Sequence, residues 1–119
     1  MAGGKAKMNL KKKLDYYIET LSKIVKIDKA ILFGSYARGD SHEYSDIDLA
    51  VISSELDPEK PYFVHNMELA DRASLYDPDL QLFAFPKEAF EKETGIEGSF
   101  IREIKKTGKV IYQNPLLYH

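Results

Sequence analysis

The segment of residues 46–52 constrains the fold more than any other part of the chain. It reads Asp-Ile-Asp-Leu-Ala-Val-Ile, an apolar run with two carboxylates at its start. Successive side chains of a β-strand point to opposite faces, so Asp46 and Asp48 share one face and Ile47 and Leu49 share the other. Two like charges on one face of a buried strand are unfavourable unless a positive group lies between them. A hard divalent cation such as Mg²⁺, which takes one or two protein carboxylates, is the natural solution.

Hydrophobic periodicity predicts further helices and strands around this segment. The helices predicted from apolar residues at helical spacing are 10–27, 62–75, 87–92 and 99–107, with Asn9 capping the first and Gly108 ending the last. The strands predicted from short apolar runs are 30–33, 47–52, 80–85 and 109–112. On the second helix, the predicted buried face consists of Phe63, Met67, Ala70 and Ala73. This order predicts an α/β (α+β) domain in which helices pack against a small mixed sheet.

The composition narrows the possible functions. A net charge of -2 argues against direct nucleic-acid binding. The absence of cysteine excludes disulfides and thiolate metal sites, and favours a reducing cytoplasm. No apolar run approaches the roughly 20 residues needed to cross a bilayer, so we expect no membrane contact. We expect one domain at 9–113, with a flexible segment at 1–8 and a tail at 114–119.

Gly34 and Ser35 directly follow the first predicted strand. Glycine allows a tight turn and a close approach of the backbone to a phosphate, and a helical turn opened by Ser35 would direct its N–H groups toward the same anion. The segment lacks the Gly-Lys-Ser/Thr ending of a Walker A loop. Taken singly, a Gly-Ser pair is commonly a turn, and paired aspartates at a strand start commonly face water. Here the two halves occur together, as Gly34-Ser35, ten residues, then Asp46-Ile47-Asp48.

With this spacing, the chain resembles the minimal nucleotidyltransferase family of the DNA polymerase β-like superfamily. The resemblance fades along the chain but extends from about residue 10 to residue 112, and it implies the polymerase β-like fold. In that family the Gly-Ser pair holds the triphosphate of an NTP and the two aspartates hold Mg²⁺. The resemblance therefore implies nucleotide binding by Gly34 and Ser35 and metal binding and catalysis by Asp46 and Asp48. The implied reaction transfers a nucleoside monophosphate, AMP from ATP, to an acceptor.

The chain departs from the family pattern at a later strand, where many members carry a third carboxylate. Gln81 stands where that acid is expected. Asp79 lies two residues earlier on the same face, so it either reaches the metal from about 7 Å back along the strand or is a turn residue of the Asp-Pro-Asp segment. Asp79 remains a candidate catalytic and metal-binding residue. Arg38 is a candidate nucleotide contact, with bracing of the loop as the equal alternative.

Three further side chains lie near the motif. We interpret His42 as a loop histidine rather than a general base. Tyr36 and Tyr44 flank the proposed site, where each is a mostly amphipathic rim residue that could also stack on a base.

The resemblance extends to antitoxins of the MntA type, which transfer AMP to a tyrosine of a HEPN-domain ribonuclease. It implies that the partner of this chain is a HEPN-domain protein. The chain is not the nuclease itself, because the span from Arg38 to His42 is too short for the HEPN signature. Two alternatives stay open. The chain could neutralise its partner by contact alone, which Gln81 motivates, or it could modify a small molecule, which the lack of an acceptor domain disfavours.

Overall fold

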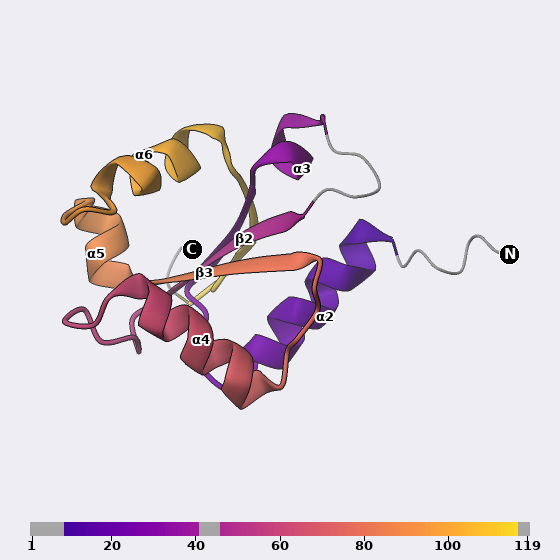
Figure 1. The fold of residues 1–119 in the computed structure, drawn as a ribbon, viewed down its shortest axis with the longest axis horizontal. Helices are drawn as coiled ribbons and strands as arrows, with labels where there is room; N and C mark the ends of the chain where they lie inside the picture. The colour runs from indigo at the N-terminus through magenta and orange to yellow at the C-terminus, as the bar shows by residue number, and fades with distance from the viewer. Residues whose placement is uncertain (1–8, 41–45, 117–119) are drawn as a thin grey trace, which may run out of the picture.

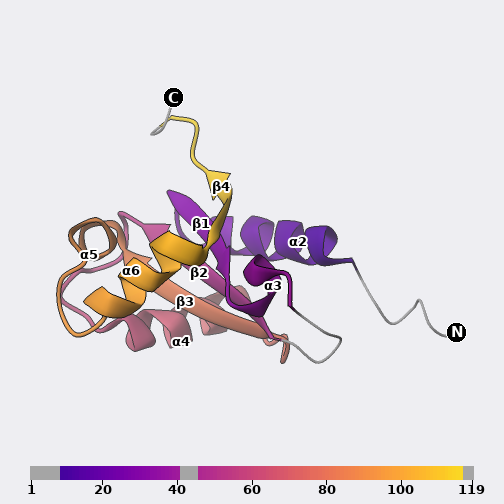
Figure 2. The same ribbon diagram turned by 90° about the horizontal axis from the view of Figure 1, so that it is seen from above.

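The computed structural model describes residues 9–40 and 46–116, and these form a mixed sheet with helices on both faces (Figures 1 and 2). The helices are α2 (Leu10–Ser22), α3 (Ser35–Arg38), α4 (Tyr62–Ala73), α5 (Lys87–Lys92) and α6 (Gly98–Thr107). The strands are β1 (Lys29–Phe33), β2 (Ile47–Ser53), β3 (Leu80–Pro86) and β4 (Lys109–Gln113). The predicted fold class and element order are confirmed. The predicted N-terminal segment, His42 and Tyr44 lie outside the described residues.

The sheet brings the two halves of the motif to one edge. Its strand order is β3-β2-β1-β4, with β1 antiparallel to β2 and β4, and β2 parallel to β3. The end of β1 therefore meets the beginnings of β2 and β3. In the register of these strands, Asp48 lies opposite Phe33 on one side and Gln81 on the other. These three residues form one row across the sheet.

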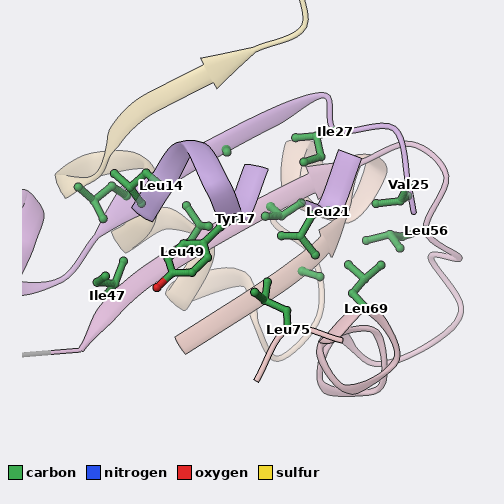
Figure 3. Packing of buried hydrophobic residues seen from close by; sticks show 14 residues of the cluster. Leu14, Tyr17, Leu21, Val25, Ile27, Ile47, Leu49, Leu56, Leu69 and Leu75 are labelled. Carbon is green, nitrogen blue, oxygen red and sulfur yellow. The ribbon is translucent and has the colours of Figure 1, made fainter. Parts of the chain in front are cut away.

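Each face of the sheet is covered by its own helices. On one face, α2 and α4 cover a buried cluster that includes Leu21, Leu49 and Leu69 (Figure 3). On the other face, α5 and α6 cover a second cluster, to which β2 contributes Ala50 and Ile52. The alternation predicted for β2 is thus observed, since Leu49 and Ile52 face different clusters. No helix in the described ranges is both long and apolar enough to span a membrane.

Two predicted helices end earlier than expected. α2 stops at Ser22, and the N–H of Lys23 donates to carbonyls of the last turn. Val25 and Ile27 are still buried, because the chain turns to enter β1 and buries them from the turn instead of from a longer helix. Asn9 caps the start of α2 as predicted, with its side chain accepting from Lys12 N at 2.9 Å. α4 stops at Ala73, before a left-handed residue.

The predicted buried face of α4 is wrong at Phe63 and Met67, whereas Ala73 packs against the core as predicted. Phe63 and Met67 are 55% and 67% exposed, whereas Leu69 is 1% exposed. Polar contacts with distant segments set the rotation of this helix. His65 is buried and its Nε2 lies 2.9 Å from the carbonyl oxygen of Asp57. Asn66 Oδ1 accepts a hydrogen bond of 2.5 Å from Ala84 N on β3, the outer strand of the sheet.

The corrected rotation of α4 can be tested by two truncations of similar size. Leu69→Ala should lower the free energy of unfolding by about 2–5 kcal/mol, because it leaves a cavity in the core. Met67→Ala should change it by less than about 0.5 kcal/mol, because this side chain faces water. Urea unfolding of both variants measures the difference. Equal losses would contradict the observed rotation.

Candidate nucleotide site

A sharp turn links β1 to the short helix α3. Gly34, the residue after Phe33, has a φ of +73°, which favours glycine. Its carbonyl oxygen accepts a hydrogen bond from Arg38 N at 3.1 Å, and Gly39 closes the turn with a φ of +84°. The helical turn predicted after Gly34 is therefore present. It directs the start of α3 over the edge of the sheet where Asp48 lies.

The backbone of Gly34 lies directly against the Asp48 carboxylate. A Cβ atom added to Gly34 would come within 3.0 Å of Asp48 Cγ and still closer to one carboxylate oxygen. Real Cβ atoms essentially never approach another atom this closely, so a side chain at position 34 would displace the carboxylate. The two halves of the sequence motif thus meet at one point of the structure, and only glycine fits there.

Asp46 and Asp48 are coupled electrostatically. Asp46 directly precedes β2 and is exposed, whereas Asp48 is the second residue of β2 and half-buried. Burial raises the pKa of Asp48, the negative charge of Asp46 raises it further, and the charge of Arg38 opposes both effects. A bound cation would relieve the cost that this raised pKa reflects.

Arg38 lies on the exposed side of α3. Its Nε forms an ion pair of 3.2 Å with Asp40, which braces the turn that ends α3. Its charge also acts on Asp48, as the pKa of that carboxyl shows. Both roles considered for Arg38, bracing the loop and contacting a phosphate, are compatible with this position.

The third-carboxylate position holds an amide. Gln81 lies beside Asp48 in the parallel register and is exposed. Asp79 precedes β3, and its carbonyl oxygen accepts a hydrogen bond of 2.7 Å from Ile47 N. Its carboxylate instead forms an ion pair with Lys13 Nζ of α2 at 3.1 Å. Within residues 9–40 and 46–116, no three Asp, Glu, His or Cys side chains are grouped to hold a metal. The structure brings Gly34 and Asp48 together but does not add Asp79 to them.

A hydrogen-bond network that the sequence did not reveal anchors the start of β3 to α2. The Tyr17 hydroxyl donates to Asp77, and Asp79 N donates to the same carboxylate at 2.9 Å. Burial alone would raise the pKa of Asp77, but these two hydrogen bonds and the charge of Lys13 hold it below its usual value. The same surroundings raise the pKa of Tyr17, with burial as the main cause. The only sequence signal for this network is a tyrosine on the apolar stripe of α2.

Removing the Tyr17 hydroxyl should destabilise the protein by an amount that depends on pH. Tyr17→Phe should lower the free energy of unfolding by about 1.5–3 kcal/mol at pH 6, because a charged acceptor loses its donor. The folded-state pKa of Asp77 is lowered, so the stabilisation is present above the unfolded pKa of about 3.9 and is lost as pH falls through the folded value. The deficit should therefore shrink at pH 3. Urea unfolding at both pH values tests this, with Tyr16→Phe, an exposed neighbour on α2, as the control.

Comparison with known proteins identifies the family to which this chain is similar. The model of the family described as "Polymerase beta, Nucleotidyltransferase" matches residues 15–115. In Methanocaldococcus jannaschii, "Putative protein adenylyltransferase MJ0604" is 33% identical over 88% of this chain and 100% of its own length. "Putative protein adenylyltransferase MJ0141" of the same organism is 36% identical over 70% of this chain and 77% of its own length.

A solved structure supports the same assignment. A chain in a mutant crystal structure of the toxin–antitoxin MntA–HpeT is 26% identical, with a TM-score of 0.56, over 92% of this chain and 76% of that one. The match of the family model and the two curated relatives together cover nearly the whole described domain. This chain therefore belongs to the polymerase β-type nucleotidyltransferases, as a minimal member of that enzyme family.

Proposed function

We propose that this chain transfers AMP from ATP to a hydroxyl group of a HEPN-type partner protein, as the antitoxin of a toxin–antitoxin pair. The observation that carries the proposal is the close contact between the Gly34 backbone and the Asp48 carboxylate. This contact joins the turn proposed to hold the phosphates to the side chain proposed to bind the metal. Two relatives are named as protein adenylyltransferases, which supports a protein acceptor. The similar chain in a toxin–antitoxin complex supports a toxin as that acceptor.

The residues present fit a magnesium ion. Asp46 and Asp48 offer hard oxygen donors, and Mg²⁺ commonly takes one or two carboxylates together with substrate phosphates and water. Burial and the charge of Asp46 raise the pKa of Asp48 although the charge of Arg38 lowers it, so a bound cation would favour the ionised carboxylate. When bound, the ion would neutralise the triphosphate and stabilise the attacking and leaving oxygens of an in-line displacement. Gly34 and Ser35 would hold the phosphates through the backbone N–H groups of their turn.

The proposed reaction forms one bond and breaks one. The acceptor oxygen attacks the α-phosphorus of ATP, the bond from that phosphorus to pyrophosphate breaks, and the acceptor keeps an AMP ester. The acceptor hydroxyl must also lose its proton. Gln81, beside Asp48, is an amide and cannot take it. We therefore expect slow turnover, with the proton passing to water or to a carboxylate near the site.

Transfer of label from ATP tests the proposal. Incubation of the chain with a cognate HEPN-domain protein, Mg²⁺ and ATP labelled at the α-phosphate should yield a labelled partner. The double variant Asp46→Asn with Asp48→Asn should give none. Absence of label with every divalent metal tried would reject the enzymatic proposal.

One observation favours a second candidate function, neutralisation by contact alone. The third-carboxylate position carries Gln81, and Asp79 is held in an ion pair with Lys13. If contact suffices, the Asp46→Asn, Asp48→Asn double variant will still suppress the toxicity of the partner when the two are expressed together. Loss of suppression in a variant that still binds the partner would reject this candidate.

A further inference from the structure

An open groove with a volume of about 380 Å³ lies on the face of the sheet that carries Asp48. Its lining comes from the start of α4, the middle of β3 and the beginning of α6, and consists of Tyr62, Phe83, Ile96, Glu97 and Phe100. The surface is mainly apolar, with one carboxylate among three aromatic rings. Neither the motif nor the proposed metal site uses any of these side chains.

The ring of Phe33 links the groove to the candidate nucleotide site. Phe33, which lies opposite Asp48 in the sheet, has its ring centroid 5.4 Å from that of Phe83 and 5.7 Å from that of Phe100. Phe83 is two residues beyond Gln81 on the same face, a step of roughly 7 Å along the strand. A nucleoside whose α-phosphate lies at Asp48 could therefore extend its base into the groove.

Glu97 lies at the end of the groove that is remote from Asp48 and the Gly34 turn. The C-terminal end of α6 leads into β4, whose Lys109 pairs with Leu32 near the Gly34 turn. The N-terminal end of α6 lies toward α5, away from α3 (Figure 2). Glu97 precedes this end, about 4.5 Å along the helix axis from Phe100. Its side chain makes no capping bond, and no other residue of the described ranges forms a hydrogen bond or ion pair with it.

We propose that this groove seats the adenine base of ATP, stacked on Phe83 and Phe100, with Glu97 accepting a hydrogen bond from the 6-amino group. The inference rests on the proposed function, because Gly34 and Asp48 must hold the triphosphate. Aromatic rings stack on the π-face of a base, and a carboxylate accepts from an exocyclic amine. An acceptor side chain fits less well, since its hydroxyl must lie at the phosphorus and not at the remote end beside Glu97.

Three ligands distinguish the contribution of the base to binding from that of the phosphates. Calorimetry with the whole chain and Mg²⁺ would compare ATP, purine riboside triphosphate, which lacks the 6-amino group, and inorganic tripolyphosphate, which lacks the nucleoside. Phe100→Leu should weaken ATP binding at least about fivefold, the lower range for loss of a stacked ring, and leave tripolyphosphate binding unchanged. An equal loss for both ligands, or no loss for ATP, would overturn the proposal.

Glu97→Ala tests recognition of the base without touching the aromatic core. Wild type should bind ATP several-fold more tightly than purine riboside triphosphate, and Glu97→Ala should remove that preference. Glu103→Ala, which deletes an exposed acid elsewhere on α6, should keep it. A preference that survives Glu97→Ala overturns the assignment of the groove alone. Wild type that binds neither ATP nor tripolyphosphate overturns the proposed function, and the groove assignment with it.

Discussion

Replacing Gly34 by alanine should lower the affinity for ATP with Mg²⁺ at least about 100-fold, or roughly 2.7 kcal/mol. The added Cβ would occupy the place of the Asp48 carboxylate, with Asp48 Cγ only 3.0 Å away. It would also strain a backbone whose φ is +73°, at a cost of about 1–2 kcal/mol. That strain is small beside a typical folding stability of about 5–15 kcal/mol, so the variant should fold. Calorimetric titration with ATP measures the loss, and circular dichroism confirms the fold.

Gly39→Ala supplies a matched control. Gly39 ends the same short helix with a φ of +84°, so alanine there carries a similar backbone strain. Among the described residues, no atom outside Gly39 and its two chain neighbours lies within 4 Å of the Cβ that the substitution would add. ATP affinity should therefore stay within about twofold of wild type. If both variants lose affinity equally, distortion of α3 and not the contact with Asp48 explains the effect.

The sequence predicted the strands because they depend on local patterns, whereas the meeting of the two motif halves was implied by the resemblance to a known family. Short apolar runs bounded by glycine or proline marked β1 and β3 correctly. Period-two alternation placed successive residues of β2 on different faces, as Leu49 in one core cluster and Ala50 in the other confirm. The resemblance carried by the spacing between Gly34 and Asp48 implied a shared site. Only the structure shows that the contact is close enough to exclude a side chain at position 34.

The rotation of α4 could not be predicted from its own periodicity. Phe63 and Met67 are spaced as a buried face should be, yet both are exposed. His65 and Asn66 fix the helix instead, through partners 8 and 18 residues away in the sequence. Hydrogen bonds of this kind depend on the tertiary arrangement, and they override the preference of two apolar side chains for burial.

The environment of Asp79 could not be predicted either, because it also depends on the tertiary arrangement. Its position two residues before Gln81 is visible in the sequence, but its ion pair with Lys13 joins residues 66 positions apart. Many lysines precede the first strand, and no local pattern indicates which of them reaches the edge of the sheet. A role for Asp79 in metal binding therefore remains a prediction, and Lys13 is the group that a metal would have to displace.

Replacing Asp48 by asparagine should abolish the Mg²⁺-dependent part of ATP binding and leave the protein at least as stable at neutral pH. The pKa of Asp48 is raised by burial and by Asp46. A carboxyl with a raised folded-state pKa favours folding most below its unfolded pKa, and this contribution is lost as pH rises through the folded value. At neutral pH the wild type therefore carries the cost of an ionised, half-buried carboxylate, which asparagine removes. Asp15→Asn, an exposed acid of α2, should change neither property.

The same raised pKa gives a second, independent signature of metal binding at Asp48. Mg²⁺ requires the ionised carboxylate, so binding near the raised pKa should release protons from wild type but not from Asp48→Asn. Titrations with ATP and Mg²⁺ in two buffers of different ionisation enthalpy measure that release directly. Without metal, the bare carboxylates of Asp46 and Asp48 repel a triphosphate, and ATP binding in chelator should be weak for both proteins. Wild type that binds ATP equally well in chelator would show that these aspartates do not anchor the nucleotide through a metal.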